Sequence, residues 1–117
     1  MAESRIRVAR VYDELSPDDG QRVLVDRLWP RGFRKDDPRI GIWCKEVAPS
    51  NELRHWYNHQ PDRFDEFAAR YQNELVGSEA LDELRQLTKC GVVTLVTATR
   101  EVKRSHAVAL AALLKSG

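Results

Sequence analysis

Two short apolar runs stand out in the pattern of hydrophobic and polar positions along the chain. Residues 23–25 and 92–96 are nearly continuous apolar segments, as in strands that are buried on both faces of a sheet. Residues 5–11 alternate instead, since Ile6 and Val8 alternate with Arg5 and Arg7, which is typical of a half-buried strand. The pattern predicts that residues 23–25 and 92–96 are neighbouring parallel strands of one buried sheet.

Helical patterns fill most of the chain between and after these runs. Ser50 is a good N-cap for a short helix, and Pro61 suits the first position of the next one, which is strongly amphipathic. The apolar stripe of that second helix consists of Phe64, Phe67, Ala68, Tyr71 and Leu75. Ser78 caps a third helix, and a last helix, from about residue 101, carries His106 on its inner stripe. This alternation of strands and helices predicts a layered α/β fold.

Two features of the sheet remain open from the pattern alone. The link between the first two strands is shorter than the roughly dozen residues of a usual parallel crossover, so these strands are either parallel or a hairpin. Residues 40–47 form a weak apolar segment that is either a short strand or a turn. The order of the strands is not determined either.

Length and composition narrow the class of protein. The chain has 117 residues, which predicts one domain over 1–117, and its formal charge of +1 gives no global attraction to nucleic acid or anionic membranes. No apolar stretch reaches the roughly 20 residues of a membrane span, and the N-terminus lacks the apolar run of a signal peptide. The two cysteines and the pair His55 and His59 match no metal-ligand motif. We therefore expect a cytoplasmic protein without a bound metal or cofactor.

Polar side chains gather where the two buried runs end. Asp26, Arg27, Trp29 and Arg31 follow the first run, and Pro30 ends that strand because it has no N–H to donate to the sheet. The second run is followed by Thr97, Thr99 and Arg100. Ligands of open α/β sheets bind just beyond the carboxyl ends of the strands, so this cluster is a candidate site.

The residue types in this cluster suit an anion. The two arginines can hold a carboxylate or phosphate with paired hydrogen bonds, and Trp29 can stack on a flat group such as a base. The threonines precede a helix whose first amides can receive the same anion. The structural alternatives are an ion pair between Asp26 and Arg27 and a core position for Trp29.

Two residues of this region can transfer protons. Asp26 is a candidate general base, or a group that orients an arginine, and His106 is a candidate proton-transfer group in the same region. The structural alternative for His106 is a neutral, hydrogen-bonded core histidine. Cys44 stands next to Lys45 but no phosphate-binding loop follows it, so we do not expect a thiol nucleophile. No complete set of nucleophile, base and orienting group is visible.

Several blocks of the chain together resemble one known family. The most specific is the seven-residue block at 26–32, and shorter matches reach the last helix. The shorter blocks are Trp43 with Lys45 and Glu46, Ala48 to Ser50 with Leu53 and Arg54, Phe67, Tyr71 with Glu74 and Leu75, and His106 with Ala107. Over nearly its whole length the sequence resembles the YeaO-like branch of domain-of-unknown-function family 488.

The resemblance implies a small single-domain, three-layer Rossmann-like α/β fold with a mostly parallel sheet and flanking helices. It implies no reaction, because the activity of the family is not established. Lys45 and Arg54 match positions of the family's motifs and add charge to the expected ligand-binding site. The chain departs from the family at Ser105, where relatives usually carry Asn before the His-Ala pair, so a ligand contact of that Asn would be altered here.

We therefore predict a small anionic ligand, nucleotide-like or phosphate-like, bound at the carboxyl ends of the strands. The alternative is a non-enzymatic interaction module that contacts a protein or nucleic acid through the same Arg/Trp cluster, since these residue types also anchor interfaces. A concave site with convergent donors favours the ligand, and a flat basic strip favours the alternative. The oligomeric state stays open.

Overall fold

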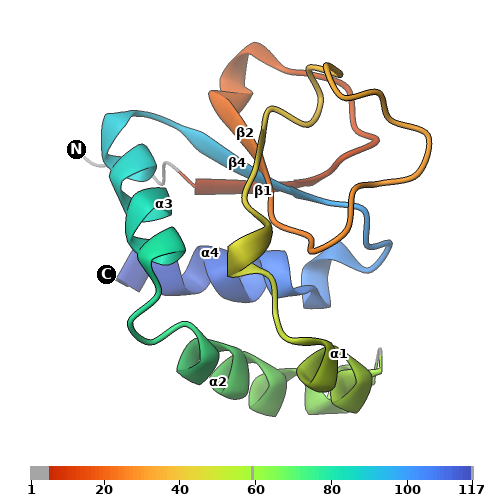
Figure 1. The fold of residues 1–117 in the computed structure, drawn as a ribbon, viewed down its shortest axis with the longest axis vertical. Helices are drawn as coiled ribbons and strands as arrows, with labels where there is room; N and C mark the ends of the chain where they lie inside the picture. Colours follow the sequence, from red (N-terminus) through yellow and green to blue (C-terminus); the bar gives the residue numbers. More distant parts are fainter. Residues whose placement is uncertain (1–5, 59, 117) are drawn as a thin grey trace.

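A four-stranded sheet forms the centre of the protein, whose structure is a computed structural model describing residues 6–58 and 60–116 (Figure 1). The strands are β1 (Ile6–Arg10), β2 (Gln21–Leu24), β3 (Ile42–Trp43) and β4 (Val93–Thr97). Their order is β1-β4-β2-β3, and every neighbouring pair is parallel. The predicted pairing of the two apolar runs is confirmed, because β2 lies beside β4 with Val23 opposite Leu95. Arg5 and His59, which entered the sequence predictions, lie outside the described residues.

The first two strands do not form a hairpin. They are parallel, and β4 lies between them. The connection at residues 11–20 contains only the 3-10 helix η1 (Pro17–Asp19), so the chain passes from one side of β4 to the other without an α-helix. Gly20 ends this connection with φ of 61°, where a Cβ atom would lie 2.1 Å from the Val92 carbonyl oxygen. Only glycine fits so close to the neighbouring backbone.

Four α-helices of the described chain lie on one side of the sheet (Figure 1). They are α1 (Asn51–Tyr57), α2 (Phe64–Glu74), α3 (Glu79–Cys90) and α4 (His106–Ser116). The hydroxyls of Ser50 and Ser78 cap α1 and α3, as predicted, and Pro61 opens the 3-10 helix η3 (Pro61–Arg63) that leads into α2. None of the described helices combines the length and apolar character needed to cross a membrane. The all-parallel sheet with these helices confirms the predicted Rossmann-like α/β fold class.

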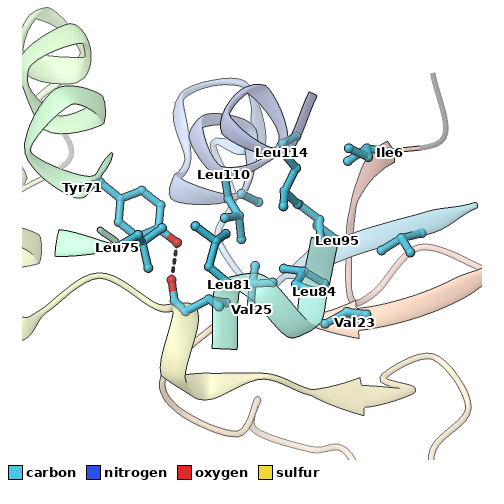
Figure 2. Packing of buried hydrophobic residues seen from close by; sticks show 14 of the residues in the cluster. Ile6, Val23, Val25, Tyr71, Leu75, Leu81, Leu84, Leu95, Leu110 and Leu114 are labelled. Atoms are coloured by element: carbon cyan, nitrogen blue, oxygen red, sulfur yellow. Dashed lines mark hydrogen bonds between the residues drawn. The ribbon is translucent and has the colours of Figure 1, made fainter. Parts of the chain in front are cut away.

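Two apolar clusters occupy the two faces of the sheet. The larger one combines sheet residues such as Val23 and Leu95 with residues of all four helices, and Figure 2 shows Leu110 of α4 among them. The smaller cluster, on the opposite face, has no helical member; it consists of Val11, Leu24, Ile40 and Val96 with the partly buried Ala9, Trp29, Phe33 and Ala98. The layer opposite the helices is therefore built by the irregular segments 11–20 and 26–41.

The aromatic stripe of α2 is buried, as its spacing predicts. Phe67, Tyr71 and Leu75 are 2%, 1% and 4% exposed. The stripe packs against α1 and α4, and Tyr57 stacks on Phe67 with 4.4 Å between the ring centres. The Tyr71 hydroxyl donates to the Val47 carbonyl oxygen (Figure 2), which attaches the segment after β3 to the helical layer.

The structure settles one open segment and corrects one expected boundary. Residues 40–47 contain a strand of only two residues, β3, followed by the 3-10 helix η2 (Lys45–Val47). The last helix begins at His106 and not near residue 101, because the 3-10 helix η4 (Val102–Arg104) comes first. Ser105 separates the two with an extended ψ of 165°, which redirects the chain immediately before His106.

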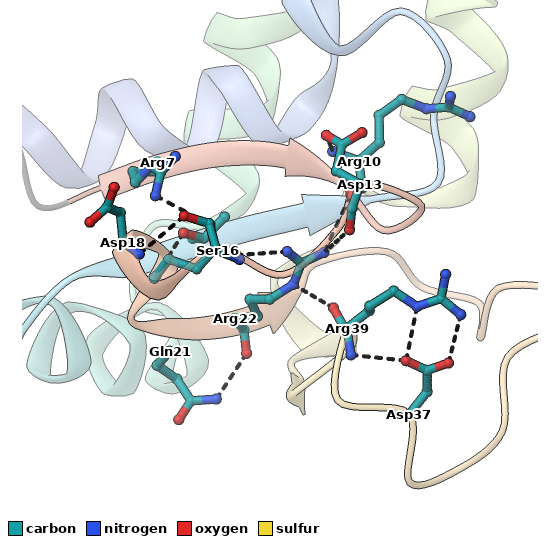
Figure 3. Close-up of polar contacts among 11 residues, drawn as sticks. Arg7, Arg10, Asp13, Ser16, Asp18, Gln21, Arg22, Asp37 and Arg39 are labelled. Carbon is teal, nitrogen blue, oxygen red and sulfur yellow. Dashed lines mark hydrogen bonds and ion pairs between the residues drawn. The ribbon is translucent and has the colours of Figure 1, made fainter.

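A buried arginine holds the loop layer together (Figure 3). The side chain of Arg22 is 3% exposed and pairs with the Asp19 carboxylate at 2.9 Å. Its other nitrogens donate to the carbonyl oxygens of Arg39 at 2.7 Å, Arg10 at 3.4 Å and Asp13 at 3.3 Å. One guanidinium therefore joins the end of β1, the connection after it and the loop before β3.

Candidate functional site

A cavity of about 380 Å³ opens at the carboxyl edge of the sheet. Its walls come from the segment after β2, the loop after β4, the start of α4, and α1 with its flanking residues. The structure brings six of the predicted site residues to this cavity: Asp26, Arg27, Trp29, Arg54, Thr99 and His106. The ends of β2 and β4 meet at one edge because the strands are parallel neighbours.

Asp26 is held by donors from two other segments. Its Oδ1 accepts from the Thr97 hydroxyl at 2.7 Å and lies 3.0 Å from Nε2 of His106. Its Oδ2 accepts from the amide of Ala98 at 2.8 Å. Nε2 of His106 also lies 3.1 Å from the carbonyl oxygen of Val25. The side chains of Asp26 and His106 are only 15% and 14% exposed, so the pair is largely shielded from water.

The carboxyl group of Asp26 stays ionised near neutral pH. Burial alone would raise its pKa, but the hydrogen bond with His106, together with the donors Ala98 and Thr97, brings the pKa below its usual 3.8. Both carboxylate oxygens are therefore occupied by the protein itself. Asp26 fixes the orientation of the His106 ring, as carboxylates commonly do for functional histidines.

Arg27 lies along the cavity with part of its guanidinium unpaired. One terminal nitrogen donates to the carbonyl oxygens of Ala48 and Pro49, each at 3.2 Å. Its Nε is buried and has no hydrogen-bond partner among the residues that the structure describes. Only one of its three guanidinium nitrogens therefore hydrogen-bonds within the described residues, and the group has donors left for an acceptor from outside the protein.

Two further arginines line the cavity from α1 and η4. Arg54, which was predicted, is exposed and donates to the side-chain oxygen of Asn51 at 3.3 Å. Arg104 was not predicted; it is held in place because its carbonyl oxygen accepts from the Tyr57 hydroxyl at 2.8 Å. The wall as a whole has three guanidiniums and two carboxylates, which gives it a net positive charge.

Trp29 forms part of the wall, and its ring is held by the protein. Its indole N–H donates to the Phe33 carbonyl oxygen at 2.9 Å, and its ring meets that of Trp43 edge-on at 5.3 Å. Trp43 in turn donates to the carbonyl oxygen of Asp26 at 2.8 Å. Trp29 is therefore a fixed apolar surface, and stacking of a ligand on it stays a prediction.

Four predicted site residues are not part of the cavity wall: Arg31, Lys45, Thr97 and Arg100. Arg31 and Arg100 are exposed on loops. Lys45 is exposed as well, and its ammonium lies 5.2 Å from the centre of the Trp43 ring. Thr97 is fully buried behind Asp26, to which its hydroxyl donates.

The loop amides directly after β4 are used within the protein. The amide of Ala98 donates to Asp26, and that of Thr99 donates to the Thr97 hydroxyl at 3.2 Å. The helix itself starts later than expected, at His106. These two amides stabilise the loop and are not unpaired donors that a ligand could use.

The cavity also includes residues that no sequence pattern indicated. They come mainly from α1 and the turn after it and are His55, Tyr57, Asn58 and Pro61, with Phe67, Glu101 and Arg104 from elsewhere. Asn58 ends α1 in the left-handed conformation, with φ of 43°, which asparagine tolerates well. The sequence feature that could have indicated these wall residues was the end of α1 shortly before Pro61, because the chain turns there at the edge of the sheet.

The described residues offer neither a grouped set of metal ligands nor an activated thiol. Within residues 6–58 and 60–116 no three His, Cys, Asp or Glu side chains are grouped to hold a metal ion. Burial, with the charges of Glu46 and Glu83, raises the pKa of the Cys44 thiol, which is the reverse of thiolate activation. The Ser105 hydroxyl donates to the Val102 carbonyl oxygen at 2.7 Å. The arrangement supplies charge, hydrogen bonds and an oriented imidazole.

Comparisons with known proteins agree with the resemblance in the sequence. Residues 5–117 match a family model described as "Inactive DUF488-N3 subclade". The uncharacterised protein Rv3073c of Mycobacterium tuberculosis (strain ATCC 25618 / H37Rv) is 71% identical over 112 residues, which cover 96% of this chain and 95% of that protein. The uncharacterised protein YeaO of Escherichia coli (strain K12) is 38% identical over 112 residues, or 95% of this chain and 97% of YeaO. No solved structure gives a significant match. The chain therefore belongs to the YeaO-like branch of the DUF488 family.

Proposed function

We propose that this protein is a cytoplasmic binding protein for a small anionic ligand, nucleotide-like or phosphate-like, that occupies the cavity at the carboxyl edge of the sheet. The observation that carries the proposal is the guanidinium of Arg27, which lines the cavity and hydrogen-bonds within the described residues through only one of its three nitrogens. Buried polar atoms of folded proteins are nearly all hydrogen-bonded. An anion in the cavity would supply acceptors for the unused donors of this guanidinium.

The other charged groups support an anion over a cation. Arg54 and Arg104 add two guanidiniums to the wall, and the planar fork of a guanidinium matches carboxylate and phosphate oxygens. The carboxylate of Asp26 repels an anion only weakly, because it already accepts hydrogen bonds from three groups of the protein. The other carboxylate of the wall, Glu101, is exposed to water.

The shape of the site supports a small ligand over the interaction-module alternative. The volume lies within the roughly 300–1,000 Å³ that is usual for small-molecule pockets. The wall is concave, and it contains apolar side chains such as Trp29, Phe67 and Pro30 as well as the arginines. A protein or nucleic-acid interface built on the Arg/Trp cluster would call for a flat basic strip instead.

Binding without turnover fits the cavity better than catalysis. Asp26 and His106 have the arrangement of a base with its orienting carboxylate. The wall hydroxyls of Ser105 and Tyr57, however, both donate to backbone carbonyl oxygens and not to the imidazole. The matching family model is described as inactive, which also favours binding. In this proposal Asp26 and His106 position the ligand.

The proposal is tested by thermal unfolding and calorimetry of the full chain with inorganic phosphate, AMP and acetate. A ligand present at about 100 times its Kd stabilises the folded state by about 2.7 kcal/mol, which gives a clear rise in Tm. The Arg54→Gln variant should bind the same anion more weakly. Arg54 is the cleanest arginine to change because it is exposed and makes one weak hydrogen bond within α1.

The matched control is Arg85→Gln, which removes the same charge from helix α3. No residue of α3 belongs to the cavity wall, so this variant should bind like the unchanged protein. The proposal is wrong if none of the three probes stabilises the protein. It is equally wrong if Arg54→Gln and Arg85→Gln lower the stabilisation to the same extent, because binding would then reflect net charge alone.

A further inference from the structure

The hydrogen bonds of His106 indicate which kind of ligand the cavity can accept. Its Nε2 lies 3.0 Å from Oδ1 of Asp26 and 3.1 Å from the Val25 carbonyl oxygen. A carboxylate and a carbonyl oxygen can only accept hydrogen bonds, so Nε2 must carry a hydrogen that these two acceptors share. In the neutral ring the other nitrogen, Nδ1, then has a lone pair and no hydrogen.

The Nδ1 lone pair is the hydrogen-bond acceptor of the ring that remains available to a ligand in the cavity. His106 lines the cavity, and the Nε2 edge of its ring is already taken by Asp26 and Val25. No described residue hydrogen-bonds Nδ1: the nearest aromatic partner, Tyr71, meets the ring edge-on at 6.3 Å, and its hydroxyl donates to Val47. The cavity therefore combines three arginines, which only donate, with an imidazole nitrogen that only accepts.

We infer, on the basis of the proposed function, that the ligand is a phosphate ester of a hydroxyl-bearing sugar, and that Nδ1 of His106 selects it by accepting a hydrogen bond from a sugar hydroxyl. A carboxylate or a fully ionised phosphate group has no hydrogen to donate and would leave Nδ1 unpaired. A phosphate monoester carries about two negative charges and three acceptor oxygens, which suits three guanidiniums better than one carboxylate does. The cavity is also larger than a phosphate ion, and Trp29, Tyr57 and Phe67 line the space that a sugar ring would fill.

The test compares two esters that differ only in hydroxyl groups. D-Ribose 5-phosphate and tetrahydrofurfuryl phosphate share the five-membered ring and the phosphate, and the second has no hydroxyl. Calorimetry with the full chain should show that ribose 5-phosphate binds about tenfold more tightly, the usual scale for one hydrogen bond of this kind. Equal affinities would overturn the inference and leave the proposed function intact. If neither ester binds, the inference fails, and the probes inorganic phosphate and AMP decide the proposed function separately.

Two variants of His106 separate ligand selection from a structural role. His106→Gln places an amide where Nε2 was, so it can still donate to Asp26, but it has no acceptor at the position of Nδ1. It should lower the affinity for ribose 5-phosphate about tenfold, to that of tetrahydrofurfuryl phosphate, and change the latter less than twofold. His106→Asn places its amide near Nδ1 and should keep part of the preference for the sugar. Equal weakening of both esters by His106→Gln would mean that the residue only supports the cavity wall.

The protonation of the ring can be read without any substitution. Long-range nitrogen–proton NMR spectra of the full chain, labelled with 15N, distinguish the two neutral tautomers of a histidine and the imidazolium. We expect the tautomer with hydrogen on Nε2 for His106 at pH 7.5. An Nδ1–H tautomer, or an imidazolium at that pH, would make Nδ1 a donor and overturn the inference even if the variants failed to fold.

Discussion

Arg22 within β2 and Arg27 just after it show two different uses of a partly or fully buried guanidinium. All three nitrogens of Arg22 donate to the protein, to one carboxylate and three carbonyl oxygens, and its side chain is 3% exposed. Arg27 donates to two carbonyl oxygens through one nitrogen, and its buried Nε has no partner in the described chain. The first arginine is saturated by the fold and the second is not.

The two arginines differ in hydrogen bonding because the segments around them are held together in different ways. The face of the sheet near Arg22 carries no α-helix of the described chain, so its irregular segments depend on the guanidinium to join them (Figure 3). The edge near Arg27 is walled by helices that pack through their own apolar stripes. Polar groups there are not needed to close the fold, and their hydrogen-bonding capacity remains for a ligand.

The largest effect should come from Arg22→Met, which removes the charge but keeps a long side chain. It leaves the Asp19 carboxylate, itself 7% exposed, without its buried partner, and breaking such a pair costs about 3–5 kcal/mol. Urea unfolding at pH 7 measures the loss, and phosphate binding by the folded fraction should not change. Arg7→Met is the matched control, because Arg7 contacts the same carboxylate at 3.2 Å but is 44% exposed, so its loss should be about 1 kcal/mol or less. Similar losses for both variants would contradict the special role of Arg22.

Asp26→Asn should have the next largest effect, about 2 kcal/mol of stability at pH 7, since hydrogen bonds to a charged group are the stronger kind. Because the pKa of Asp26 in the folded protein lies below its ordinary 3.8, the carboxylate stabilises the protein fully above that value. This stabilisation is lost as the pH falls through the lowered pKa of the folded state. The difference in stability between the unchanged protein and the variant should therefore shrink in acid. A difference that stayed constant or grew as the pH fell would show that the charge of Asp26 is not stabilising.

Arg27→Gln should reverse the pattern of Arg22→Met. The variant loses two hydrogen bonds to carbonyl oxygens, which is about 1 kcal/mol of stability. Binding of phosphate should fall by about 2 kcal/mol or more, as expected when one partner of a buried charge pair is truncated. Calorimetry and urea unfolding of the same preparation give both values. A large loss of stability with unchanged binding would make Arg27 a second structural clamp and end the contrast with Arg22.

Most of the fold could be predicted from the sequence because apolar spacing reports directly on burial. The runs at 23–25 and 92–96 are buried neighbouring strands, and the stripe containing Phe67 and Tyr71 is buried in the helical layer. The short crossover before β2 could not be predicted, because it depends on how closely Gly20 approaches β4. These are contacts between distant segments, which local periodicity does not contain.

The candidate site could be predicted only in part, for a similar reason. Asp26 and Arg27 follow directly from their place after a buried strand, since parallel strand ends share one edge. Arg104 could not be predicted, because its position depends on a hydrogen bond from Tyr57, far away in the sequence. The positions of α1 and of the bend at Ser105 are also tertiary properties.

Arg31 is close to Arg27 in the sequence, but its side chain is not placed at the cavity. Its substitution should therefore have the smallest effect on stability and binding. Arg31 belongs to the same block as Arg27, but it is exposed and outside the cavity wall. Pro30 before it is buried at the cavity, and Gly32 after it has φ of 87°, so the loop turns at this point.

Arg31→Ala should therefore change stability by about 0.5 kcal/mol or less, as is usual for exposed positions without special contacts. Phosphate affinity, measured by calorimetry beside Arg54→Gln as the positive control, should stay within about 0.5 kcal/mol, because a charge at the rim acts mainly on the association rate. A loss of binding near that of Arg27→Gln, without loss of stability, would mean that the loop moves over the ligand and brings Arg31 into the cavity. The contrast between saturated and open arginines would then include a third kind, one whose partner arrives only with the ligand.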